Sequence, residues 1–327
     1  MTLHRRTVLK TLAAAGACAS SWPAWAQANW PNRPIRYIVP FAPGGTTDIL
    51  GRVVGEKLAA ALGQPVIIEN KPGQGGSAGA AELARAAPDG YTLGGGTISS
   101  HAINATLYDK LPYDPIRDFA PVASTGVSPY LLATHPALPV NNLKDFIAHA
   151  RARPGVLNYS SSGAGGLGHL SGELFNQLTG VKMQHVPFKG GAQLITELVG
   201  NRVQLEILDP NFAKPHVDAG RLKAVVVTSK DRIVTMPNVP TTAESGLPTY
   251  TPTFWMGLYA PAGTPKAIVD QVNGELRTIL SNPEVRKRYA ARGFTTEWMT
   301  PEATQRRIAA ELSSLNKIVD DAKIERQ

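Results

Sequence analysis

Short apolar runs alternate with helical patterns along most of the chain. Residues 35–39 (IRYIV) read as a strand, and the segment after them places Leu50, Val53 and Leu58 on one helical face. The same order of strand, turn and helix recurs at residues 65–86, 91–101, 157–180 and 185–200. This alternation predicts an α/β fold with largely parallel sheets.

The first 28 residues have a different pattern, which is typical of a bacterial export signal. A basic head that contains the pair Arg5 and Arg6 precedes a short apolar stretch and a run of small residues. The arginine pair resembles a twin-arginine signal, and we expect cleavage after Ala28, with Ala26 as the competing site. Cys18 loosely matches a lipoprotein cleavage box, which gives lipidation as the alternative.

The composition excludes several classes of function. The chain has 33 Lys and Arg against 25 Asp and Glu, a formal charge of +8. Removing the signal takes away three basic residues and the single cysteine, so the mature charge is +5. A chain without cysteine cannot use thiol catalysis or a cysteine zinc site. Its basic residues are scattered, so the charge does not indicate nucleic-acid binding.

Four predicted strands are followed by turns rich in Gly, Ser and Thr. In open α/β sheets such turns gather at the carboxyl ends of the strands, where ligands bind. Glycine lets the backbone approach a ligand closely, and a helix start offers unpaired N–H groups. The sequence therefore predicts an anion site made mainly of backbone and hydroxyl donors. The four turns are residues 41–48, 97–101, 160–168 and 188–191.

Two motifs favour enzymatic alternatives. Residues 163–168 fit a dinucleotide-binding fingerprint, but the next strand lacks the acidic residue that such a site requires. Residues 75–79 match a nucleophile elbow, which makes a secreted serine hydrolase with Ser77, Asp209 and His216 the alternative function. The histidines show no pairing at metal-ligand spacing, so we predict no metal or cofactor.

Read in order, the turns resemble those of a known family, the Bug-type periplasmic solute-binding receptors of tripartite tricarboxylate transporters. The opening segment carries RPIRYIVPFAPGGTTD, and later segments carry ENKPGQGG, PDGYTL, YSSSG and VPFKG. The matching segments cover nearly the whole mature chain, at residues 30–48, 69–76, 87–93, 111–119, 159–163, 186–190 and 240–248.

The resemblance implies a two-lobed periplasmic binding protein of the type II-like α/β fold. Each lobe would be a mixed, mostly parallel sheet flanked by helices, with the ligand cleft between the lobes. Residues 29–126 and 252–327 would form a discontinuous first lobe, and residues 127–251 the second. Such a receptor closes on a small organic carboxylate and delivers it to an integral-membrane permease. It is not an enzyme, needs no cofactor and is expected to be a monomer.

The same resemblance implies the ligand-binding residues. Phe41 would form an apolar wall, and the helix start after it would supply donors. Phe188 stands where the family usually has tyrosine, which favours a less polar ligand. The full implied set is Phe41, Gly45, Thr46, Thr47, Asp48, Ser99, His101, Ser161, Ser162, Gly163, His169, Lys189, Gly190 and Asp209.

Overall fold

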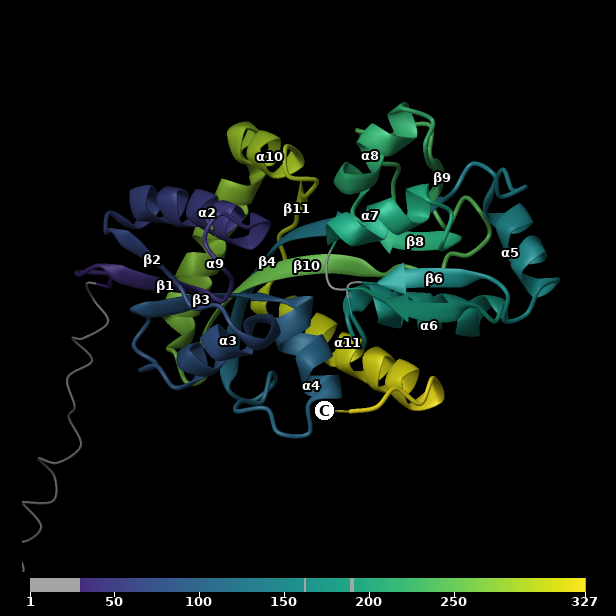
Figure 1. Cartoon of the computed structure of the whole chain (residues 1–327). Coiled ribbons are helices and arrows are strands. Elements are labelled where there is room, and N and C mark those ends of the chain that lie inside the picture. The colour runs from purple at the N-terminus through teal and green to yellow at the C-terminus, as the bar shows by residue number, and fades with distance from the viewer. Residues whose placement is uncertain (1–29, 162, 189–190, 327) are drawn as a thin grey trace, which may run out of the picture.

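The computed structural model describes residues 30–161, 163–188 and 191–326. Within these residues two β-sheets lie next to each other, and helices cover both faces of each sheet (Figure 1). The first sheet has the strand order β11-β4-β10-β3-β1-β2, and the second has the order β7-β6-β8-β5-β9. We call each sheet with its helices a lobe. The predicted two-lobed α/β fold is confirmed.

The first lobe surrounds the six-stranded sheet. Its strands are β1 (Ile35–Val39), β2 (Val66–Asn70), β3 (Thr92–Thr97), β4 (Phe119–Pro129), β10 (Thr253–Pro261) and β11 (Thr295–Thr296). Its helices are α2 (Thr46–Leu62), η2 (Gln74–Gly76), α3 (Ser77–Ala84), η3 (Ser99–Ile103), α4 (Asn104–Leu107), α9 (Lys266–Ser281), α10 (Pro283–Ala290) and α11 (Pro301–Asp321). Helix α2 runs as its apolar pattern predicts, since Leu50, Val53 and Leu58 are buried and Gly63 ends it at φ +67°.

The second lobe surrounds the five-stranded sheet. Its strands are β5 (Leu131–Thr134), β6 (Asn158–Ser161), β7 (Gln184–Pro187), β8 (Leu205–Leu208) and β9 (Lys223–Val227). Its helices are α5 (Leu143–Arg151), α6 (Leu167–Thr179), α7 (Gly191–Val199) and α8 (Pro210–Asp218). Phe146 of α5 and Phe175 of α6 fill one core, and Leu198 of α7 and Ala213 of α8 belong to a second core.

Both sheets are mixed, as the resemblance implies, but neither is mostly parallel. Strand β1 pairs in parallel with β2 and β3, and β6 pairs in parallel with β7 and β8. Strand β10 is antiparallel to β3 and β4, and β5 is antiparallel to β8 and β9. The antiparallel pairs arise because the chain crosses from the first sheet to the second after β4 and returns through β10.

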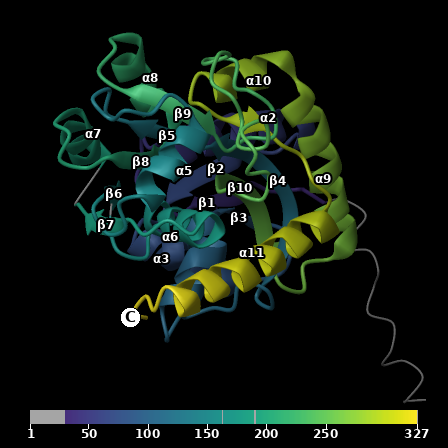
Figure 2. The same cartoon turned by 90° about the vertical axis from the view of Figure 1, so that its right-hand side faces the viewer.

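A third connection between the lobes is apolar packing. Helix α6 of the second lobe buries Leu170, 1% exposed, in a cluster with Leu107 of α4 and with Leu315 and Ile318 of α11. Figures 1 and 2 both place α6 beside the C-terminal half of α11. The turn that begins α6 is therefore fixed to the first lobe as well as to the second.

Candidate ligand-binding site

The first turn predicted to bind a ligand, residues 41–48, links β1 to α2. Phe41 is half-buried and the glycines after it are exposed. Helix α2 begins after Gly45, and the backbone N–H groups of Thr46 and Thr47 have no intrahelical acceptor, as in the first turn of any α-helix. The turn thus presents backbone donors at the positive end of a helix dipole.

Asp48 holds this turn in place. Its side chain is 3% exposed, and Oδ2 accepts hydrogen bonds from Gly44 N–H (2.9 Å) and Arg52 Nε (3.1 Å). Oδ1 accepts from Asn70 Nδ2 (2.8 Å) and lies 3.0 Å from Arg52 Nη2. Asn70 Nδ2 also donates to Phe41 O (2.9 Å), so Asp48 and Asn70 together connect both ends of the turn to β2.

The charge of Asp48 is stabilised by these contacts. Burial opposes the charge, but the hydrogen bonds from Arg52, Gly44 and Asn70 and the charge of Arg52 outweigh it, so the pKa of Asp48 lies below its usual value. Both carboxylate oxygens already accept hydrogen bonds within the protein. Asp48 therefore acts on the turn, and the donors that face outward are those of the backbone.

The second predicted turn follows β3 and separates its two candidate residues. Ser99 is half-buried, whereas His101 is fully buried in the first lobe. The His101 ring stacks on Tyr259, with centroids 4.0 Å apart, and contacts Phe119 at 4.7 Å. Burial lowers the pKa of His101 to about 3. The structure therefore places His101 in the core rather than on a ligand-facing surface, a distinction that the spacing of the turn did not reveal.

The third predicted turn links β6 to α6 in the second lobe. Ser161 is 1% exposed, and its Oγ donates to Gly163 O (2.8 Å). His169 is 8% exposed, and its Nδ1 accepts from Gly165 N–H (2.9 Å). Ala164, between these two glycines, is exposed. Ser162, Lys189 and Gly190, which the resemblance also implied, lie outside the described residues.

His185 of β7 belongs to this turn although the sequence did not single it out. Its Nε2 lies 2.6 Å from Ser161 Oγ, and its ring stacks on His169 with centroids 3.7 Å apart. Burial and the neighbouring His169 lower the pKa of His185 to about 4. Alternation along a strand puts His185 and Pro187 on one face, which was the only sequence signal for this placement.

The two lobes meet close to these turns. A Cβ added at Gly165 would clash with Leu107 of α4, so the α6 turn touches the first lobe directly. Likewise, a Cβ at Gly293 would clash with Asn211 of α8. Asp209 caps α8 there by accepting from Asn211 N–H (2.8 Å), and burial raises its pKa.

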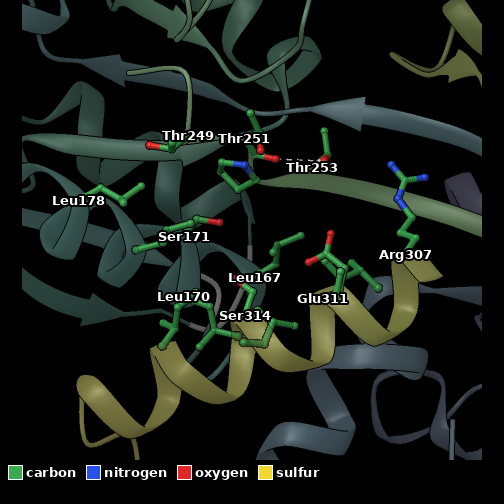
Figure 3. A pocket seen from close by; sticks show the side chains of 16 residues that line it. Leu167, Leu170, Ser171, Leu178, Thr249, Thr251, Thr253, Arg307, Glu311 and Ser314 are labelled. Atoms are coloured by element: carbon green, nitrogen blue, oxygen red, sulfur yellow. Dashed lines mark hydrogen bonds between the residues drawn. The ribbon is translucent and has the colours of Figure 1, made fainter. Parts of the chain in front are cut away.

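Two cavities lie elsewhere along the lobe boundary. One, of about 310 Å³, separates α6 from α11, and Figure 3 shows Ser171 and the leucines of α6 facing Arg307 and Glu311 of α11 across it. The other, of about 760 Å³, lies between the 228–235 segment and the residues from Ala290 to β11, and Arg307 and Glu311 line it too. None of the predicted site residues that the structure describes lines either cavity.

The serine hydrolase alternative is wrong. Ser77 is 1% exposed, and its Oγ accepts from Asn104 Nδ2 (2.7 Å) and lies 3.3 Å from Tyr113 Oη, all within the first lobe. Asp209 and His216 belong to α8 of the second lobe. A nucleophile without an adjacent base cannot be activated, so the motif at residues 75–79 is a structural turn.

The described residues contain no group of three metal-ligating side chains that could hold an ion. Among the same residues, no helix is long and apolar enough to cross a membrane.

Comparison with known proteins assigns the family. Residues 50–324 match the model of the tripartite tricarboxylate transporter family receptor. Protein BugT of Bordetella pertussis is 36% identical over 285 residues, which cover 87% of each chain.

Solved structures agree with this match. R. palustris Rpa4515 with adipate is 36% identical, with a TM-score of 0.74 over 91% of this chain and 100% of that one. MatC (Rpa3494) from Rhodopseudomonas palustris with bound malate is 34% identical, with a TM-score of 0.69 over 89% and 100%. The matched family is described as a receptor, not as an enzyme. The chain therefore belongs to the tripartite tricarboxylate transporter receptor family, as a Bug-type member.

Proposed function

We propose that this protein is an exported receptor that binds a small organic carboxylate between its lobes and delivers it to a membrane permease. The observation that carries the proposal is the pair of helix-start turns, one in each lobe, at residues 41–48 and 160–168. Each presents backbone N–H groups at the positive end of a helix, the arrangement that favours a carboxylate. The adipate and malate named for two neighbours support the same ligand class.

Lobe closure would complete the site. We take residues 29–126 with 252–327 as the first lobe and 127–251 as the second. The start of β10 at Thr253 supports the second boundary, whereas β4 continues to Pro129, three residues beyond the first. A ligand that contacts both turns interacts more strongly with the closed state and so increases its population. The periplasm is the proposed location, after removal of residues 1–28.

Phe188 favours a less polar member of the class. It stands where the family usually has tyrosine and packs partly against the second core of the second lobe. We therefore expect adipate, whose carboxylates are joined by methylenes, to bind more tightly than malate, which carries a hydroxyl that would need a partner.

A thermal-shift screen of the mature protein tests the ligand class. We expect at least one mono- or dicarboxylate to raise the melting temperature, because a ligand at 100 times its Kd adds about 2.7 kcal/mol of stability. Uncharged amides of the same acids should give no shift. The proposal fails if no carboxylate in the panel shifts the transition.

A further inference from the structure

Two histidines form the base of the turn between β6 and α6. His169, in the first turn of α6, and His185, on β7, have ring centroids 3.7 Å apart and planes 11° apart. Tyr159 of β6 lies beside both rings, with centroids 6.4 Å from His169 and 5.2 Å from His185. Its hydroxyl donates to Glu173 of α6 (2.6 Å). The pair is thus built into the lobe and is more than a surface contact.

Each ring holds one side of the turn. Ser161 Oγ lies 2.6 Å from His185 Nε2 and 2.8 Å from Gly163 O, and it accepts from Gly163 N–H at 3.3 Å. Gly165 N–H donates to His169 Nδ1 (2.9 Å), so the proton of neutral His169 is on Nε2.

The turn itself has little intrinsic rigidity. Gly163 has φ +143° and Gly165 has φ +74°, conformations that only glycine adopts readily. The turn's backbone hydrogen bond from Gly166 N–H to Gly163 O is long, at 3.4 Å. Without the contacts from Ser161 and His169, these glycines would sample many conformations, and a ligand would have to order them on binding.

We propose that His185 is a positioning residue for carboxylate binding, which holds Ser161 and thereby keeps the turn at residues 163–169 in its binding conformation. It acts through the Ser161 hydroxyl, which in turn contacts the backbone of Gly163. The ring stack supports His169 but is secondary to this hydrogen bond. The inference rests on the proposed function, because it assumes that the turn receives the ligand.

Three variants of the full mature protein separate hydrogen bonding from packing. His185→Ala removes both contacts, His185→Gln retains an N–H donor that can reach Ser161 Oγ, and His185→Phe retains a stacked ring without a donor. We expect His185→Ala and His185→Phe to bind adipate at least tenfold more weakly by calorimetry, and His185→Gln to stay within threefold of the original protein. His149→Ala, on α5 with its Nδ1 beside Arg153, is the matched control and should bind normally.

Hydrogen exchange in the ligand-free protein gives a second readout. Amides of the 161–169 segment should exchange at least tenfold faster in His185→Ala and His185→Phe, with His185→Gln close to the original rate. Rescue by phenylalanine but not glutamine would overturn the proposal in favour of packing, and so would unchanged exchange in His185→Ala. Faster exchange with unaltered adipate affinity would also reject it. Failure of the original protein to bind any carboxylate would refute the proposed function and, with it, this role in binding.

Discussion

Replacing Asp48 with alanine is expected to weaken carboxylate binding at least tenfold, about 1.4 kcal/mol. Asp48 is 2% exposed and accepts from Gly44 N–H, Asn70 Nδ2 and Arg52, so its removal frees the turn that begins α2. The free energy of unfolding should fall by about 1–3 kcal/mol, because buried donors lose their acceptor. Calorimetric titration and urea denaturation measure the two effects.

Asp270→Ala is the matched control for this prediction. Asp270 also forms an i,i+4 pair, with Lys266 on α9, but both of these side chains are largely exposed. Such a pair contributes at most about 1 kcal/mol, and it lies on a helix outside the predicted site. Normal affinity in Asp48→Ala, with the protein still folded, would show that the turn at residues 41–48 does not bind the ligand.

Because of His101, the free energy of unfolding of the original protein is expected to fall by about 2 kcal/mol between pH 7.5 and pH 5.0. His101→Phe should not show this loss. Burial lowers the pKa of His101 to about 3, whereas the unfolded chain takes up this proton below about pH 6.5. The unfolded state therefore binds more protons than the folded state between these two values. The contribution of neutral His101 to the free energy of unfolding is therefore fully present above pH 6.5. It falls as the pH decreases from about 6.5 to about 3.

The measured quantity is the difference between the original and variant proteins at each pH. Burial raises the pKa values of Glu206, Asp209 and Glu311, which act in the opposite direction and cancel in the difference. Phe119→Leu is the control, since it disturbs the same aromatic cluster without removing a titratable group, and should lower stability equally at both pH values. If the free energies of unfolding of the original protein and of His101→Phe differ by the same amount at pH 7.5 and pH 5.0, His101 is not held neutral in the folded protein.

The sequence located the turns better than it located the side chains within them. The strand, glycine-rich turn and helix at residues 35–62 could be read from periodicity and helix-start signals, and α2 lies where they predicted. The same signals could not tell that Asp48 points back into its own turn or that His101 packs on Tyr259. Turn chemistry is local, whereas the burial of a side chain depends on which distant strands lie above it.

His185 is a second residue whose contacts could not be predicted from the sequence. It is 24 residues from Ser161 in the chain, and only the parallel pairing of β6 with β7 brings the two side chains together. The pairing of Ser161 with Pro187 sets this register, and a shift by one residue would turn His185 to the opposite face of the sheet. No spacing rule within a single chain encodes such a contact.

By itself, the sequence determined the α/β class, the positions of the glycine-rich turns and the family, because local periodicity and the order of motifs are written along the chain. Only the tertiary structure decided that neither sheet is mostly parallel and that α6 is packed into the first lobe through Leu170. It also decided that Ser77 lies in the first lobe, whereas Asp209 and His216 lie in the second. The tertiary structure also decided which polar groups of the candidate site form hydrogen bonds that hold the turns in place, and which groups face outward. The physical reason is that burial, register and contacts between the lobes are properties of elements far apart in sequence.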